Sequence, residues 1–560
     1  MKKIFSIFLA FVSIQFFAQI KVTVDKIIYN AKIYTVNENF EIAQAMAVLN
    51  GKVVGVGNEL EILAKFTSKN IENLQGKSVY PGFIDAHSHF TGFALDQWKA
   101  ELLGTKSWEE ILEKLQLYSK NATSKWIYGR SWDQNDWAIK EFPNRVKLDS
   151  LFPDRPVYLK RIDGHAAIAN QKALEIAGIT SDTKVEGGEI EVKEGDLTGI
   201  LIDNALLLVE KHIPEISDEL ALNYIDILQK ECFSLGLTSL HDAGISVKMF
   251  QLLDKAQNKK MLKMKIFALL EDNPETYDEW ISKGRYKKGL VTFGGYKVYS
   301  DGALGSRGAC LLHDYSDKKG WKGFLLAKPE NFKNLATRLA ASNLQMATHA
   351  IGDSANQEIL KIYGDVLTGQ TDRRWRIEHA QIVNAEDFQL FGKNQIIPSV
   401  QPTHATSDMN WVEYRIGKER MKTAYAYQEL LKQNGWIPLG TDFPVEDINP
   451  IKTFFAAVVR KDVQNLPKEG FQKENALTRE QALRGMTIWA AKAAFDENEK
   501  GSLEMGKAAD YVILNQDIMT VSEDKILETK VLETYSNGNQ MYEDPMQKLQ
   551  KKEAAAKLKK

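Results

Sequence analysis

Short β-rich runs mark both ends of this chain. Between Val22 and Val56 apolar and polar residues alternate in short runs, and Asn50-Gly51 is a dipeptide typical of a tight hairpin turn. Residues 501–515 and 530–542 show the same pattern near the other end. We expect the two ends to pair into one small β domain, formed by residues 19–79 together with residues 498–545.

The long middle of the chain alternates strand-like apolar runs with helix-like segments such as 249–257 and 331–342. The strand-like runs are 235–244, 265–271, 294–302, 344–353, 373–381, 395–402 and 436–444. Repeated strand and helix units predict an α/β fold with a parallel sheet, and their number favours a barrel over residues 80–100 and 231–497. Residues 101–230 are less regular, and we interpret them as an insertion that covers the barrel.

The first 18 residues have the pattern of a secretory signal peptide. Lys2 and Lys3 precede an apolar run from Ile4 to Phe17, and the small residue Ala18 offers a cleavage site. The run has about 14 residues, whereas a membrane span needs about 20, so an uncleaved anchor is the weaker alternative. We therefore expect an exported protein, periplasmic or secreted, that keeps no stable membrane span after cleavage.

The composition excludes some classes of protein. The 560 residues include 72 Lys and Arg against 74 Asp and Glu, and 44% are hydrophobic, which supplies a large core. A net charge of -2 is not the basic excess of nucleic-acid binders, and the basic tail, residues 546–560, is expected to be a solvated helix. Because the two cysteines, Cys232 and Cys310, cannot build a disulfide framework, the nine histidines carry the chemical signal.

The strongest chemical signal is His87-x-His89 at the end of the strand-like run that starts at Tyr80. Residues i and i+2 of a strand project to the same side, so both histidines can hold one cation, although solvated loop histidines are the alternative. Four later strand ends carry a further ligand or proton carrier. These are Lys297, His349, His379 and Asp442. Since the carboxyl ends of barrel strands meet at one rim, we expect a metal site there.

Several segments together resemble the motif series of the metal-dependent amidohydrolase superfamily. The closest likeness is to the YtcJ-like branch, which resembles N-substituted formamide deformylase, and it covers nearly the whole mature chain. The segments are PGFIDAHSH, GRSWDQNDW, DGHAAIANQKAL, YKVYSDGALGSR, HAIGDSAN, RIEHAQ, SVQPTHATSDM and GTDFPVEDINP. The resemblance implies a distorted (β/α)8 TIM barrel with a small β-sandwich domain built from both termini.

The resemblance also implies a ligand set. His87 and His89 would bind one divalent metal, and His349 and His379 a second. Lys297 would be N-carboxylated by CO2 and bridge the two ions, while Asp442 would bind metal and shuttle a proton. Two Zn²⁺ ions suit these ligands, with Mn²⁺, Fe²⁺ or Co²⁺ as substitutes. A mononuclear site, in which an unmodified Lys297 contacts substrate or pairs with a carboxylate, stays open.

This chemistry predicts a hydrolase that cleaves a non-peptide carbon-nitrogen bond in a small amide-type substrate. A bound divalent ion lowers the pKa of water from about 15.7 to about 7 and polarises a carbonyl. A metal-bound hydroxide would attack the carbonyl, with Asp442 acting first as base and then as acid. The alternatives are a deaminase, an ester or phosphoester hydrolase on the same scaffold, or an exported binding protein without turnover. A homodimer is left open.

Further pocket candidates lie around this set. The resemblance suggests that the insertion closes over the site and contacts substrate through Trp132 and His165, although packing within the insertion is the alternative for Trp132. Arg307 is either a donor to the substrate or half of a surface ion pair. His404 and Asp408 follow a strand end and line the pocket. The remaining candidates are structural or exposed in our interpretation, namely Asp242, His241, His212 and His313.

Overall fold

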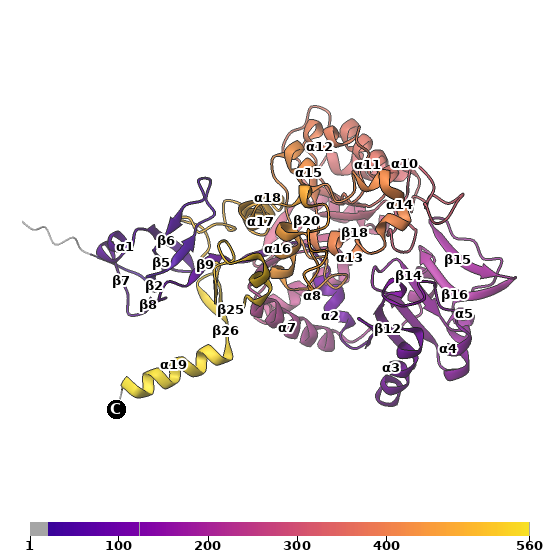
Figure 1. Cartoon of the computed structure of the whole chain (residues 1–560), viewed down its shortest axis with the longest axis horizontal. Helices are drawn as coiled ribbons and strands as arrows, with labels where there is room; N and C mark the ends of the chain where they lie inside the picture. The colour runs from indigo at the N-terminus through magenta and orange to yellow at the C-terminus, as the bar shows by residue number, and fades with distance from the viewer. Residues whose placement is uncertain (1–20, 123, 559–560) are drawn as a thin grey trace, which may run out of the picture.

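The structure is a computed structural model that describes residues 21–122 and 124–558. Figure 1 shows small β-sheets at one end of the molecule, a barrel in the middle and a further sheet on the other side of the barrel. The predicted signal peptide lies outside the described residues. Within those residues, none of the helices combines the length and the apolar character that crossing a membrane requires.

A parallel sheet forms the centre of the molecule, which confirms the predicted α/β barrel. Seven of its eight strands are parallel and hydrogen-bonded in chain order, and the eighth, β19 (Tyr286–Lys288), pairs antiparallel with β20 at the side. The seven parallel strands follow in order. They are β10 (Phe83–Ser88), β17 (Leu237–Ile245), β18 (Lys265–Glu271), β20 (Val291–Tyr299), β21 (Gln345–Ala350), β22 (Arg376–His379) and β23 (Ile397–Ser399). Connecting helices include α7 (Asp218–Ser234), α8 (Val247–Asn258), α10 (Pro329–Ala340), α11 (Asp353–Val366) and α15 (Tyr427–Asn434). Nearly every residue of these strands is buried, as expected for a parallel sheet covered by helices.

The segment 437–442 closes the barrel between β23 and β10. On one side the N–H of Val400 donates to the carbonyl oxygen of Pro438 (3.2 Å), and the N–H of Gly440 donates to the carbonyl oxygen of Val400 (3.1 Å). On the other side the N–H of Ala86 donates to the carbonyl oxygen of Leu439 (3.1 Å). A Cβ on Gly440 would lie 2.5 Å from the backbone nitrogen of His87, so only glycine permits this approach.

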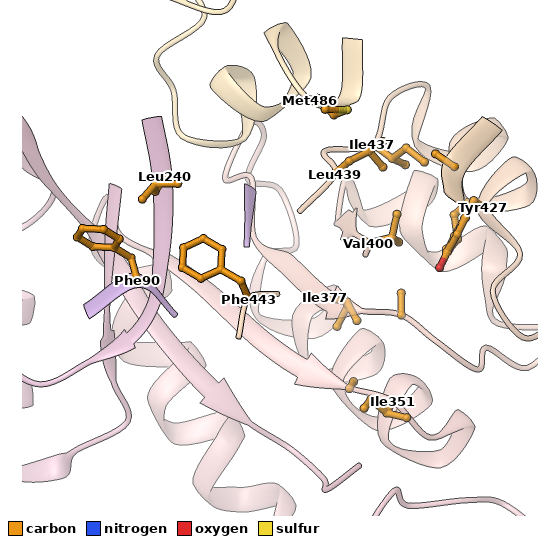
Figure 2. Packing of buried hydrophobic residues seen from close by; sticks show 14 of the residues in the cluster. Phe90, Leu240, Ile351, Ile377, Val400, Tyr427, Ile437, Leu439, Phe443 and Met486 are labelled. Carbon is orange, nitrogen blue, oxygen red and sulfur yellow. The ribbon is translucent and has the colours of Figure 1, made fainter. Parts of the chain in front are cut away.

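Apolar side chains fill the space between the closing segment and its neighbours. Figure 2 shows Phe90, Leu240, Ile377 and Phe443 converging from four different parts of the chain, and all four are fully buried. Burial of a Phe or Leu side chain stabilises the fold by about 1.5–3 kcal/mol. Because Phe443 directly follows Asp442, its burial anchors the backbone that presents the Asp442 carboxylate.

Both ends of the chain contribute to the small β-sheets. In one sheet β24 (Tyr511–Leu514) pairs antiparallel with β9 (Ser78–Pro81), so the C-terminal segment completes a sheet begun near the N-terminus. In another, β5 (Ala45–Leu49) and β6 (Lys52–Gly57) are joined by Asn50-Gly51, both at positive φ (52° and 75°). The basic tail contains α19 (Pro545–Leu558), which is anchored by Lys551 to Glu533 at 2.6 Å.

The region interpreted as an irregular insertion contains an ordered sheet. Six strands pair in the order β11-β12-β13-β14-β16-β15, beginning at β11 (Ala100–Glu101), β12 (Ile127–Trp132) and β13 (Val157–Arg161) and ending at β15 (Gly188–Lys193). Its last strand in chain order is β16 (Asp196–Asp203), which pairs antiparallel with β14 (Ala166–Ala169). The helix α7 starts within the expected bounds of the insertion but packs on barrel strand β17. The insertion lies beside the barrel in Figure 1.

Candidate metal centre

His87 and His89 project from the carboxyl end of β10 toward one carboxylate. The Nδ1 of His87 lies 2.5 Å from Oε2 of Glu378, and the Nδ1 of His89 donates to the carbonyl oxygen of Ala243 (2.9 Å). These contacts leave both Nε2 atoms directed at Oδ1 of Asp442, at 3.4 Å for His87 and 3.1 Å for His89. Metal-binding histidines are usually oriented by a hydrogen bond from the other ring nitrogen to a carboxylate or a carbonyl oxygen.

Asp442 lies at the centre of the cluster, held by the closing segment. Its N–H donates to the carbonyl oxygen of His87 (2.8 Å), and its φ of 64° is an uncommon left-handed conformation for aspartate. Burial raises the pKa of the Asp442 carboxyl, but the surrounding histidines, His87 foremost, more than offset this and leave it well below the usual range. The carboxylate is therefore ionised, and its buried Oδ1 has no hydrogen-bond partner among the described residues.

His349 and His379 complete the group of strand-end histidines. They end neighbouring strands, β21 and β22, and their ring centroids are 4.6 Å apart. The ring of His379 also lies 5.0 Å from that of His87, so the four histidines form one continuous cluster. The Nδ1 of His379 is 2.8 Å from Oε1 of Gln401, which orients the ring.

Lys297 lies inside the same cluster. It is fully buried on β20, with Nζ 3.3 Å from Nε2 of His87 and 4.5 Å from the ring centroid of Tyr299. Burial lowers the pKa of Lys297 to about 8, although Glu378 and Asp442 act in the opposite direction. A substantial shift toward the neutral amine is the expected effect of removing a lysine from water.

The residues present fit a divalent metal ion. Two sets of side chains place their ligand atoms within 4.8 Å of one another and share Asp442. One set is His87, His89 and Asp442, and the other is His379, His404 and Asp442. Imidazole nitrogens and carboxylate oxygens are ligands that suit Zn²⁺ and related ions. The unpaired Oδ1 of Asp442 supports this, because an orphaned buried carboxylate oxygen is costly unless a cation is bound.

Glu378 is a residue of the cluster that the sequence did not predict. Its side chain, like those of His87 and Arg376, is fully buried, and Oε1 lies 2.8 Å from Nε of Arg376. Burial raises the pKa of Glu378, but the neighbouring Arg376 and His87 lower this pKa by a larger amount. The pKa of Glu378 therefore lies below its usual value, and the carboxyl group is ionised. The available signal was the pair of charged residues, Arg376 and Glu378, on one face of an otherwise apolar strand.

Asp85 is a second residue that the sequence analysis passed over. Its Oδ1 accepts hydrogen bonds from the backbone N–H groups of His87 (3.1 Å) and Thr441 (3.0 Å), and Oδ2 accepts from the Thr441 hydroxyl (2.6 Å). Burial raises the pKa of Asp85 to about 7. This side chain joins the first strand to the closing segment and so positions His87 relative to Asp442.

Two of the pocket candidates, His165 and His404, reach the cluster. The ring of His165 lies 4.9 Å from that of His349, with Nδ1 2.6 Å from Oδ1 of Asp203. His404, on the short helix α13 (Pro402–Asp408), has Nε2 3.1 Å from Oδ2 of Asp442. Its other ring nitrogen lies 3.1 Å from Oε1 of Glu446. His404 was expected only to line the pocket, but the structure makes it a candidate ligand.

Trp132 and Arg307 have the surroundings of the alternatives that the sequence left open, packing within the insertion and an ion pair. Trp132 is fully buried in the apolar core of the insertion, where its indole N–H donates to the carbonyl oxygen of Leu159 (2.9 Å). A large aromatic ring stabilises a small domain more when it is buried in the apolar core than when it faces a hydrated pocket. Arg307 pairs with Asp317 at 2.9 Å on a partly exposed loop, as the ion-pair alternative proposed.

The remaining polar candidates have structural surroundings. The Oδ2 of Asp408 accepts hydrogen bonds from the Gln381 side chain (2.9 Å) and the Tyr425 hydroxyl (2.7 Å). Asp242 accepts from the N–H of Thr91 (3.1 Å). The ring of His241, which is fully buried, has Nδ1 3.0 Å from the guanidinium of Arg376. Both His212 and His313 are exposed.

A parallel barrel with a strand-end cluster of histidines and a shared aspartate defines the class of metal-dependent barrel hydrolases. The comparison with known families agrees: the model of the amidohydrolase family matches residues 70–542. The chain belongs to the amidohydrolase family, which confirms the family predicted from its motifs.

Three relatives cover nearly the whole chain. Protein LONG AFTER FAR-RED 3 of Arabidopsis thaliana is 34% identical over 93% of this chain and 92% of its own length. YtcJ of Bacillus subtilis (strain 168) is 29% identical over 91% of this chain and 98% of its own. N-substituted formamide deformylase of Arthrobacter pascens is 27% identical over 93% of this chain and 98% of its own length. A solved structure, an uncharacterized metal-dependent hydrolase from Pyrococcus horikoshii OT3, is 29% identical with a TM-score of 0.72, over 89% of this chain and 99% of that one.

The contact between Glu378 and His87 leads to a prediction about metal affinity. We expect Glu378→Gln to raise the metal dissociation constant by about 10- to 100-fold, because the neutral amide no longer holds and polarises the His87 ring. Metal titration of the purified apoprotein measures this change. Glu386→Gln is the matched control, since Glu386 is exposed, and its affinity should equal that of the wild type. Equal affinities for all three proteins would contradict a role of Glu378 in the site.

Proposed function

We propose that this protein hydrolyses a non-peptide carbon-nitrogen bond in a small amide-type substrate, with two divalent metal ions, Zn²⁺ by preference. The observation that carries the proposal is the convergence of His87, His89, His379 and His404 on the Asp442 carboxylate at one end of the barrel. The relative named N-substituted formamide deformylase supports an amide as the substrate class. Its 27% identity extends over 93% of this chain.

Two groups of donor side chains support the proposal, His87, His89 and Asp442 in one and His379, His404 and Asp442 in the other, whereas His349 belongs to neither group. In our proposal His87 and His89 hold one ion, His349 and His379 hold the second, and Asp442 binds beside them. His404 is a further ligand candidate, because its Nε2 lies 3.1 Å from Oδ2 of Asp442. When bound, such ions make water acidic enough to attack at neutral pH and polarise the carbonyl oxygen of the substrate.

Asp442 is the group in the best position to move a proton. Its pKa lies well below the usual range, so it is an ionised base before the reaction. Asp442 takes the proton of the attacking water at a carboxylate oxygen and returns it to the leaving nitrogen, serving as base and then as acid. The hydrogen bond of its N–H to His87 and the burial of Phe443 keep the carboxylate fixed during both transfers.

Lys297 is proposed to be carboxylated by CO2 and to bridge the two ions. Carboxylation requires a neutral amine, and burial already lowers the pKa of Lys297 to about 8. The product is an anion with two oxygens. A buried lysine cation facing His87 at 3.3 Å would repel metal ions, whereas the carbamate would attract them.

The proposed function predicts turnover that depends on metal and on Asp442. We expect the wild type to hydrolyse members of a panel of formamides and N-acyl amines, and to lose this activity after removal of metal with a chelator. Asp442→Asn should lower kcat by about 10²- to 10⁴-fold because general acid-base transfer is lost. Its metal content, measured by elemental analysis, should remain that of the wild type.

The control for this experiment is Asp447→Asn, because Asp447 is an exposed carboxylate a few residues along the same loop. It should retain wild-type turnover. An Asp442→Asn enzyme with wild-type turnover would remove Asp442 from the mechanism. A metal-loaded wild type that cleaves esters but none of the amides would contradict the carbon-nitrogen assignment.

The bridging role of Lys297 predicts a change in metal stoichiometry. We expect Lys297→Ala to bind one metal equivalent where the wild type binds two, since the shared ligand is gone. Elemental analysis after equilibration in bicarbonate buffer measures the ratio of metal to protein. Lys263→Ala supplies the control, because Lys263 is an exposed lysine outside the cluster. Two equivalents in Lys297→Ala would contradict the bridge.

Export is proposed from the first 18 residues. The charged start, the apolar run and Ala18 predict cleavage after Ala18, which leaves Gln19 as the first residue of the mature protein. Mass spectrometry of the N-terminal peptide after expression in a bacterial host with a secretion pathway tests this. A protein that retains Met1 and remains with the cell contents would contradict export.

A further inference from the structure

Tyr299 ends strand β20, two positions after Lys297. Residues i and i+2 of a strand project to the same side, so the ring of Tyr299 lies beyond Lys297 in the direction of the barrel mouth. The Nζ of Lys297 is 4.5 Å from the ring centroid. On the neighbouring strand β21 the partner of Tyr299 is His349, and the two ring centroids are 5.4 Å apart. Tyr299 therefore covers the cluster on the side from which a substrate arrives.

The phenol ring extends from β20 toward the end of β17. A Cβ on Gly244 would lie 3.4 Å from the hydroxyl oxygen of Tyr299. Gly244 directly follows Ala243, whose carbonyl oxygen accepts the hydrogen bond that orients His89. The ring thus lies beside His349, while its hydroxyl lies near the strand end that holds His89. The hydroxyl is therefore close to the place where the proposed reaction occurs.

The hydroxyl of Tyr299 makes no hydrogen bond among the described residues. Other buried tyrosines near the barrel differ: the hydroxyl of Tyr363 bonds to that of Thr348 (2.6 Å), and the hydroxyl of Tyr425 donates to Asp408 (2.7 Å). The side chain of Tyr299 is partly exposed, so a bound molecule can reach it. Once a substrate covers the mouth and excludes water, this hydroxyl needs a partner on the substrate.

The strand order places Tyr299 across the barrel from Asp442. Counted along the sheet from β10, β20 is the fourth parallel strand, and the closing segment takes the eighth position. In the proposed function Asp442 returns a proton to the leaving nitrogen, so the nitrogen of the amide faces Asp442. The carbonyl oxygen of the same amide then faces Tyr299. A carbonyl oxygen has lone pairs but no proton, so the phenol is the donor in this contact.

We propose that the Tyr299 hydroxyl donates a hydrogen bond to the oxygen of the scissile carbonyl and is thereby a catalytic residue. When the oxygen of water forms its bond to the carbonyl carbon, the electron pair of the C=O double bond moves onto the carbonyl oxygen. The hydrogen bond strengthens as this negative charge builds up. This role of Tyr299 rests on the proposed function, because it requires a substrate with a scissile carbonyl group.

Tyr299→Phe tests the role of the hydroxyl, because the phenylalanine ring still packs beside Lys297 and His349. We expect kcat on the amide to fall about 10- to 100-fold, the effect of one hydrogen bond to a charged oxygen. KM should change by less than about threefold, because the contact is strongest in the transition state. Metal content should equal that of the wild type. Tyr414→Phe is the matched control, since Tyr414 is 71% exposed, and it should keep the wild-type kcat.

A second measurement reports the hydrogen bond without turnover. An amide with an isotope label at its carbonyl carbon is bound to metal-loaded Asp442→Asn, and infrared difference spectroscopy gives the stretching frequency of the bound carbonyl. A donated hydrogen bond weakens the C=O bond and lowers this frequency. We therefore expect a higher frequency when Tyr299→Phe is added to Asp442→Asn. Adding Tyr414→Phe instead should leave the frequency unchanged.

The outcomes separate the role of Tyr299 from the proposed function. An unchanged kcat, an unchanged carbonyl frequency or a loss of bound metal in the Tyr299→Phe proteins would each overturn the hydrogen bond to the carbonyl oxygen. In each of these cases the wild type still cleaves the amide, so the proposed function stands. A metal-loaded wild type that cleaves none of the amides would overturn the proposed function and the role of Tyr299 together.

Discussion

The hydrogen bonds between the closing segment and its two neighbours are the constraint on which the metal centre depends. Leu439 accepts from Ala86, and the N–H of Asp442 donates to the carbonyl oxygen of His87, so the last strand position is attached to the first. Gly440 allows this approach because a side chain would collide with the backbone of His87. Asp85 reinforces it with three hydrogen bonds, which offset the cost of burying its carboxyl group. Every distance from Asp442 to a histidine follows from this attachment.

A second constraint is charge balance in a dry interior. Glu378, Arg376 and Lys297 are fully buried within the same cluster as Asp442. Buried charges persist only when each has a partner of opposite sign or a bound ion. Glu378 has a cationic partner, Arg376, at 2.8 Å, whereas the contacts of Asp442 are to histidine nitrogens at 3.1 to 3.9 Å. Among the described residues, Oδ1 of Asp442 forms no hydrogen bond, and neither does Oε1 of Glu378. The imbalance lies at the position where the histidine nitrogens converge, which is the physical basis for a cation there.

Much of the architecture could be predicted from local pattern. Apolar runs of strand length such as 265–271 became barrel strands, because burial on both faces of a parallel sheet demands continuous apolar sequence. The motifs also predicted the family. For Trp132 and Arg307 the sequence left two alternatives open, because an aromatic ring or a guanidinium can have the same local sequence whether it packs in a core, pairs on a surface or faces a pocket. The partners of these two residues are Leu159 and Asp317.

The sequence by itself determined the chemistry that is available: six metal-competent or proton-carrying side chains, His87, His89, Lys297, His349, His379 and Asp442, each at the end of an apolar run. Only the tertiary structure decided which of them meet and what orients them. Glu378 lies 291 positions from His87, and Thr441 lies 356 positions from Asp85. Such contacts depend on barrel closure and strand register, which are set by packing over the whole sheet. Local spacing along the chain carries no information about them.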